Sequence, residues 1–235
     1  MALNRVVSVP IQRKKLTQQI YDALESQILT GTLPPGTKLS EGEVAEVFDV
    51  SRSPAREAIK ELERIGFATR VGPRDRVVAK PTVKSIRDFF QTWWILDAGR
   101  TYQASLEATE PERKRLLELI DELEAALDCE DKPRAAQLTE EFHGLLYGRT
   151  PNKLLEKIAA ENQKYLAWLR QLYLENVNDS YNWRKEHRAI VLAFLHRDLA
   201  GLIDALRAHI LRQGEEIIRN LEIQQELKHD VSRTS

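Results

Sequence analysis

Two arginines stand one helical turn apart at the start of a predicted helix. Arg52 and Arg56 lie in the run Ser-Arg-Ser-Pro-Ala-Arg-Glu-Ala, which begins at Ser51. Ser53 followed by Pro54 is a helix-start signal, because a hydroxyl can accept from the free amides and proline has no amide to leave unpaired. Apolar residues at three- and four-residue steps then predict one buried stripe, made of Ala55, Ala58, Ile59, Leu62 and Ile65.

The arginines fall off this stripe, which places them on the exposed side of the first turn. An arginine there can read base edges in a DNA major groove, and the hydroxyls of Ser51 and Ser53 can touch phosphate. The other interpretation is a solvated basic helix start that binds nothing.

The neighbouring segments favour the DNA-binding interpretation. Residues 33–39 form a predicted turn, and Ser40 can cap a short helix over about 41–48. After the arginine helix, residues 68–79 read as two short strands around a Gly-Pro turn at Gly72. Together these elements describe a winged helix-turn-helix, with Arg74 and Arg76 on the wing near the sugar-phosphate backbone.

Three histidines are the second group that could do chemistry. His143, His187 and His209 each lie on the apolar face of a different predicted helix. Imidazole is the commonest transition-metal ligand, so three converging histidines predict a zinc-like divalent metal site with positions open for water or an effector. Two alternatives stay open: ordinary hydrogen-bonded core histidines, or a polar pocket whose histidines bind an anionic effector directly.

The histidines belong to a C-terminal half in which the signal is helical throughout. We expect a mainly α protein with a winged helix-turn-helix domain at 1–80 and an all-helical domain at 81–235. The second domain should hold about six helices, and residues 1–12 and 228–235 should lie outside regular structure. The predicted helices cover 83–109, 111–128, 133–148, 151–176, 180–196 and 199–226.

Composition and charge narrow the class of protein. The 235 residues are enough for two small domains with cores of their own. Residues 1–80 carry a net charge of +3 and the remainder −4, as expected when only one end touches nucleic acid. Cys129 is the only cysteine, and no apolar run is long enough for a membrane span, so we expect a cytoplasmic protein.

The N-terminal part resembles the DNA-binding domain of the GntR family of bacterial transcription regulators. The resemblance runs from Leu16 to Val78 and rests above all on the run from Ser51 to Ala58, with Gly31, the Pro35-Gly36 pair and Leu39. It implies that Arg52 and Arg56 are the main DNA-contacting arginines. The chain departs from the family at Asp75, where the wing usually has glycine, and at Gly42, where a basic residue is common.

The C-terminal half resembles the effector-binding FCD domain of the FadR-type branch of that family. The resemblance covers residues from about 83 to 225. It rests on three short segments that contain His143, His187 and His209. In that family the histidines bind a divalent metal, completed by a carboxylate one turn before the first of them. Here Thr139 stands in that place. A three-histidine zinc site remains our expectation.

The effector wall also departs from the family. The first long helix of an FCD domain commonly carries an arginine that grips a carboxylate, and our alignment places Trp93 and Asp97 at that point. Trp93 would give a flat stacking wall, unless it is ordinary core or a dimer contact. We therefore predict an effector site formed by Trp93, Asp97, Arg100 and Thr139, and an aromatic or heterocyclic ligand.

These features predict a ligand-responsive regulator that represses a catabolic operon. It should bind a palindromic operator in double-stranded DNA as a homodimer, because paired half-sites demand a twofold axis. Two other classes were weighed. A metal-dependent enzyme would leave the DNA-reading domain unexplained, and a sequence-neutral architectural DNA binder would need more positive charge.

Overall fold

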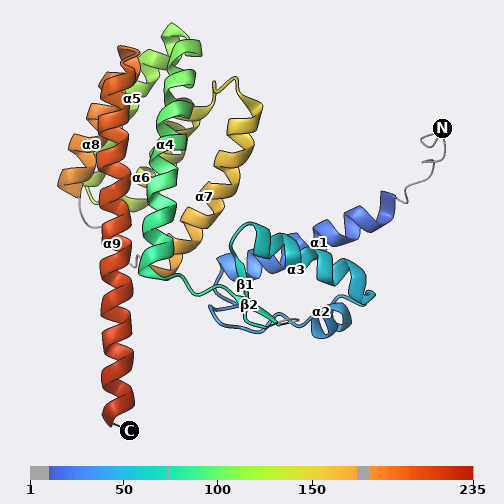
Figure 1. Cartoon of the computed structure of the whole chain (residues 1–235). Helices are drawn as coiled ribbons and strands as arrows, with labels where there is room; N and C mark the ends of the chain where they lie inside the picture. The colour runs from blue at the N-terminus through green and yellow to red at the C-terminus, as the bar shows by residue number, and fades with distance from the viewer. Residues whose placement is uncertain (1–10, 73–74, 174–179, 235) are drawn as a thin grey trace, which may run out of the picture. The chain divides into compact units, whose positions relative to one another are not determined.

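A computed structural model describes residues 11–72, 75–173 and 180–234. The chain divides into two compact units, which are described separately. Unit 1 consists of residues 1–81 together with residues 164–172. Unit 2 consists of residues 82–163 and 173–235. Both are mainly helical, which confirms the predicted fold class (Figure 1).

Unit 1 is built from three helices and one small hairpin. Its elements are α1 Ile11–Leu29, α2 Glu41–Val47, α3 Arg52–Arg64, β1 Ala68–Arg70 and β2 Arg76–Val78. The strands pair antiparallel, with Ala68 opposite Val78. The core lies between α1, α3 and the hairpin, because the apolar stripe of each helix is buried there. Its members include Ile20, Leu24, Ile28, Ala58, Ile59, Leu62, Phe67 and Val78.

Two predicted boundaries in unit 1 were wrong. The helix α3 begins at Arg52 with Ser51 as its N-cap, although Ser53 was expected to cap it. The helix α1 begins at Ile11, inside the segment that was expected to be a loose arm. Other expectations hold: Gly66 has a φ of 89° just after α3, and Asp49 turns the chain between α2 and α3 with a φ of 50°.

Unit 2 is a bundle of helices. They are α4 Val83–Glu107, α5 Glu110–Asp128, α6 Lys132–Tyr147, the first part of α7 Lys153–Tyr173, α8 Ser180–Leu195 and α9 Leu199–Thr234. The helices α4 and α9 lie side by side along much of their length, and α9 also packs on α8 (Figure 1). The helix α5 packs on α6.

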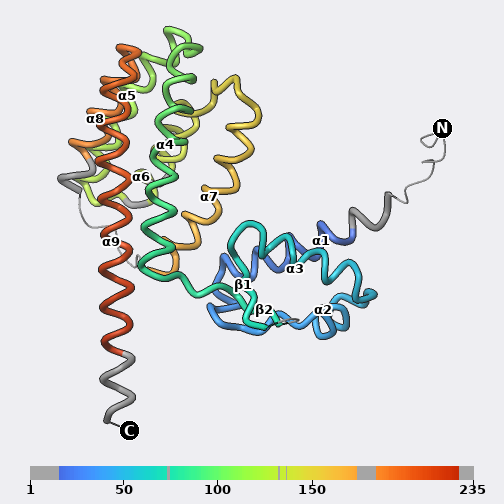
Figure 2. The backbone as a smooth tube through the Cα atoms, viewed as in Figure 1, coloured from blue at the N-terminus to red at the C-terminus, as the bar shows by residue number. Residues whose placement is uncertain are grey.

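The predicted breaks before α5, α6 and α7 are confirmed, whereas the predicted break at residues 178–179 lies outside the described residues. Capping groups explain where two of the helices begin. Thr82 starts α4 in a reciprocal cap with Ser85, and Asp131 caps α6 by accepting from the amide of Arg134. The exception is α9, which continues to Thr234 although its end was expected to fray. The run from Glu222 to Lys228 holds strong helix formers and no glycine or proline, so nothing in it stops the helix. Figure 2 shows α9 running past the start of α4.

Within the described part of the chain, no helix is long and apolar enough to cross a membrane.

Candidate functional site

The first turn of α3 presents a polar surface. Ser51, Arg52, Ser53 and Arg56 are all exposed, while Ala55, Ala58, Ile59 and Leu62 of the same helix are buried. The side chain of Arg56 is 48% exposed, and its nearest ionic neighbour is Glu57, at 3.9 Å. The buried stripe therefore anchors α3 in unit 1 and leaves both arginines available to a partner, as the sequence predicted.

The wing differs from the prediction. Arg74 lies outside the described residues, and Gly72 is partly buried at the hairpin turn. Arg76 was expected to approach DNA, but its side chain is only 6% exposed. Its Nε donates to Glu63 at 2.5 Å, and its Nη1 lies 3.6 Å from Glu41. Side chains alternate along β2, so Arg76 shares the inward face with Val78.

This buried ion pair joins the wing to the two helices of the helix-turn-helix. The hydrogen bond from Arg76 lowers the pKa of Glu63, so the pair stays charged. Arg76 is therefore a structural residue of unit 1, and the prediction that it contacts DNA was wrong.

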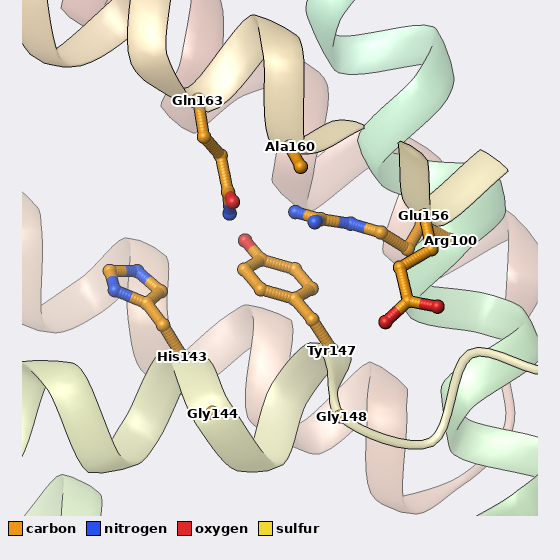
Figure 3. A pocket seen from close by; sticks show the side chains of 8 residues that line it. All are labelled: Arg100, His143, Gly144, Tyr147, Gly148, Glu156, Ala160 and Gln163. Carbon is orange, nitrogen blue, oxygen red and sulfur yellow. The ribbon is translucent and has the colours of Figure 1, made fainter. Parts of the chain in front are cut away.

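Unit 2 contains a pocket with a cavity of about 340 Å³ between α4, α6 and α7. Figure 3 shows the Arg100 guanidinium, the Tyr147 hydroxyl and the Gln163 amide pointing toward one another, with the His143 imidazole beside them. This size is typical of small-molecule sites, which combine a few polar groups with apolar walls. The lining residues are Arg100, His143, Gly144, Tyr147, Gly148, Glu156, Ala160 and Gln163.

A buried cluster of three side chains forms one wall of the pocket. The Nη2 of Arg100 donates to Asp97 at 2.6 Å, and the Tyr147 hydroxyl donates to the other oxygen of Asp97 at 3.0 Å. The guanidinium carbon lies 3.6 Å from the centre of the Tyr147 ring. Arg100 is 4% exposed, and its Nε has no hydrogen-bond partner. A buried donor without an acceptor is costly, so this atom marks a place where a ligand oxygen would be stabilised.

Burial raises the pKa of both acidic groups in this cluster. It raises the pKa of Asp97, and the nearby Arg100 and Tyr147 only partly oppose that rise. Burial also raises the pKa of Tyr147, which keeps its hydroxyl protonated as a donor.

The three predicted metal ligands have different ring neighbours. The rings of His187 and His209 meet edge-on, with centres 4.5 Å apart, and Nδ1 of His209 lies 2.7 Å from Glu186. His143 instead stacks on Tyr147, with ring centres 5.8 Å apart, at the pocket. Among the residues that the structure describes, no group of three or more His, Cys, Asp or Glu side chains is placed to hold a metal ion.

The chemistry of the donors nevertheless suits a metal in part. A carboxylate such as Glu186 on one ring nitrogen of His209 fixes the ring and directs the other nitrogen away, as second-shell carboxylates do for metal-binding histidines. The zinc site therefore stays a prediction.

Of the four predicted effector residues, Arg100 lines the pocket and Asp97 holds it in place. Trp93 is buried and stacks on Phe89, with ring centres 6.3 Å apart, and it is not among the residues lining this pocket. Thr139 donates its hydroxyl to the carbonyl of Ala135 at 2.7 Å.

The sequence reasoning missed Tyr147 and the three residues from α7. Tyr147 stands one turn after His143, a spacing that could have revealed it. Glu156, Ala160 and Gln163 share one face of α7, but only the packing of α7 shows that this face meets the pocket.

Comparison with known proteins agrees with this geometry. The model of bacterial regulatory proteins of the gntR family matches residues 16–74, and the FCD domain model matches residues 94–212. The chain is 26% identical over 214 residues to the uncharacterized HTH-type transcriptional regulator YdhC of Bacillus subtilis (strain 168). The match covers 84% of this chain and 93% of that protein. It is also 26% identical over 202 residues to the HTH-type transcriptional repressor RspR of Escherichia coli (strain K12), covering 86% and 89%.

Solved structures share the fold. A GntR-type regulator from Rhodococcus sp. RHA1 superposes with a TM-score of 0.61 at 17% identity, over 87% of this chain and 98% of that one. The E. coli protein McbR/YncC gives a TM-score of 0.59 at 20% identity, over 88% and 98%. The two family models and the curated relatives are those of transcription regulators, so the enzyme alternative is discarded. The chain belongs to the GntR family of bacterial transcription regulators, with an FCD effector-binding domain in its C-terminal half.

Proposed function

We propose that this regulator is a homodimeric repressor that is released from its operator by a small carboxylate compound bound at Arg100. The observation that carries the proposal is the unpartnered Nε of Arg100, a buried donor at a cavity of about 340 Å³. A carboxylate supplies two acceptor oxygens in a plane, which matches the rigid donor geometry of a guanidinium.

The lining residues favour a ligand with a single negative charge. Arg100 already shares its charge with Asp97, and Glu156 adds a carboxylate to the pocket. A citrate-like compound would bring several negative charges close to these groups and would be repelled. A compound with one carboxylate and a flat ring could instead place that ring beside Tyr147 and His143. The aromatic surface then comes from α6, not from Trp93 as the sequence had suggested.

Ligand binding tests this proposal. We expect benzoate or picolinate to raise the melting temperature of the purified chain and to weaken its binding to DNA from its own upstream region, while citrate at equal concentration does neither. Arg100→Lys should weaken benzoate binding by about tenfold or more, because lysine lacks the planar fork.

Because Arg100 is buried, its replacement could weaken benzoate binding by disturbing the fold. A second variant at an exposed residue controls for this. Gln163→Leu changes an exposed lining residue and should also weaken benzoate, while Lys157→Met on the same helix serves as a control. Tight citrate binding, or benzoate binding that survives both pocket changes in folded protein, would rule the proposal out.

A divalent metal beside the effector is the second part of the proposal, and the Glu186–His209 contact supports it. Elemental analysis of the purified chain should then give about one zinc ion per protomer. His187→Ala should remove the ion and lower the melting temperature, because a ligand bound only by the folded state stabilises it. If metal-free protein is still released from DNA by benzoate, the histidines contact the effector directly instead of binding a metal.

Homodimerisation follows from how such a domain reads DNA. A single helix-turn-helix covers one half-site, whereas two copies related by a twofold axis can span a palindromic operator. Effector binding would then favour a dimer geometry whose recognition helices no longer match the half-site spacing.

A further inference from the structure

The helix α7 contributes residues to both units of the chain. In its first half Glu156, Ala160 and Gln163 line the pocket of unit 2. Its second half, residues 164–172, belongs to unit 1. The change of unit falls between Gln163, a pocket residue, and Lys164, its direct neighbour.

The apolar side chains of residues 164–172 complete the core of unit 1. Trp168 is fully buried and meets Phe67 edge-on, with ring centres 5.4 Å apart. Tyr165 lies against the same phenylalanine at 6.0 Å. Phe67 follows directly after Gly66, the glycine that ends the recognition helix α3. Tyr165 and Trp168 therefore lie at the end of the DNA-reading helix.

An ion pair ties the same segment to α1. The ammonium of Lys164 lies 2.8 and 3.0 Å from the two carboxylate oxygens of Glu25. Glu25 is only 7% exposed, and the hydroxyl of Tyr21 donates to it as well. A carboxylate so deeply buried depends on its partners, so the position of Lys164 matters to α1.

We infer that residues 164–172 of α7 transmit the state of the effector pocket to the DNA-reading helix. A helix transmits rotation and tilt along its length, because each turn is hydrogen-bonded to the next. A ligand that draws Gln163 toward Arg100 therefore also displaces Lys164 and, one turn on, Trp168. The two arrangements of α7 need to differ only in their affinity for the ligand and for DNA. This inference rests on the proposed function of the pocket.

The test measures coupling rather than binding. In the unaltered chain, saturating benzoate should weaken operator binding by a factor within the usual range of about 5 to 150. In Lys164→Met, the affinity for benzoate should change by less than about twofold. The factor by which benzoate weakens operator binding should instead fall toward one. Lys157→Met, the control on the same helix, should keep the full factor. A factor in Lys164→Met equal to that of the unaltered chain would overturn the inference.

The double variant Glu25→Gln/Lys164→Gln controls for misfolding, because removing both charges leaves no unpaired carboxylate at residue 25. It should also uncouple the two sites.

A second measurement needs no effector, so it separates this inference from the choice of ligand. Coupling is reciprocal, and operator DNA must therefore alter the pocket half of α7. Hydrogen exchange of residues 153–163 should change at least twofold when operator DNA is added, and it should not change in Lys164→Met. Failure of benzoate to bind, with this exchange effect present, would overturn only the proposed ligand. Absence of the exchange effect in the unaltered chain would overturn the role of α7.

Discussion

At the scale of single residues, arginine has three roles in this chain, and its surroundings decide which one applies. Arg52 and Arg56 stand on the exposed side of α3. Arg76 is buried between Glu63 and Glu41 and holds the wing. Arg100 is buried too, but one of its donors has no acceptor. The number of donors that the protein satisfies therefore separates the structural arginine, Arg76, from the arginines predicted to contact DNA or proposed to receive a ligand.

The exposed arginines give the first prediction. Replacing Arg52 or Arg56 by alanine should each cost about 1–3 kcal/mol at the operator, because a bidentate contact with guanine is lost. Titration by mobility shift, with operator and random DNA side by side, measures this change.

Arg64→Ala is the matched control. Arg64 lies in the last turn of the same helix, where it pairs with Glu61, so its loss removes an equal charge away from the expected groove contact. Equal losses in all three variants would mean that α3 contributes charge alone and that its first turn does not read bases.

At the scale of elements, capping groups set where the helices of unit 2 begin. Glu112 accepts from the amide of Thr109 at 2.9 Å and from its hydroxyl at 2.6 Å, and Arg149 donates to its other oxygen at 2.9 Å. These hydrogen bonds lower the pKa of Glu112 to about 2. Since the folded pKa lies below the unfolded one, the stabilisation is present above pH 4.5 and is lost as the pH falls toward 2.

Unfolding in urea at several pH values tests this cap. At pH 6, Glu112→Gln should lower the free energy of unfolding by about 1 kcal/mol, less than the full shift implies, because the carboxylate is partly exposed and screened. The difference between variant and unaltered chain should shrink between pH 4.5 and pH 2. Glu118→Gln, at a more exposed carboxylate of the same helix, should cost little at either pH. A pH-independent cost for Glu112→Gln would contradict the assigned role of its charge.

The packing of α4 on α9 gives a prediction from two glycines. A Cβ added at Gly214 of α9 would lie 2.7 Å from Cγ of Phe90, a fully buried side chain of α4. Gly214→Ala should therefore destabilise unit 2 by about 1–3 kcal/mol through overpacking.

Gly99→Ala is the control, because no atom lies within 4 Å of the added Cβ. There the higher helix propensity of alanine should raise stability by about 0.5–1 kcal/mol. Thermal unfolding of both variants gives the comparison. Stabilisation at both positions would show that the contact between α4 and α9 is looser than described.

At the scale of the whole molecule, the chain combines a DNA-reading unit with a ligand-binding unit. The helix α7 contributes residues to both units. The twofold symmetry expected of an operator gives the last prediction. Sedimentation should show a species of about twice 27.0 kDa, and protection of the upstream DNA should cover two half-sites about one helical turn apart. Changing the spacing by half a turn, about 5 base pairs, should abolish tight binding. A monomer that protects one half-site would contradict the proposed dimer.

Much of this organisation could be predicted from the sequence, because it depends on local patterns. The apolar stripe of α3, the glycine after it and the exposed arginines follow from residue spacing within a few turns. The helices of unit 2 follow in the same way, since prolines and capping residues mark most of their ends. The end of α9 was missed because a polar sequence with strong helix propensity was taken for a frayed one.

The tertiary structure alone decided which side chains from distant helices meet. Arg76 turned inward because strand alternation and two carboxylates from other elements fix its side chain. His143 stacks on Tyr147, whereas His187 and His209 meet edge-on, and the pocket gains Gln163 from a helix whose polar face carried no distinguishing signal. Trp168 became part of the DNA-binding unit for the same reason. Periodicity fixes which face of a helix is apolar, whereas the partner of that face depends on long-range packing that no local pattern encodes.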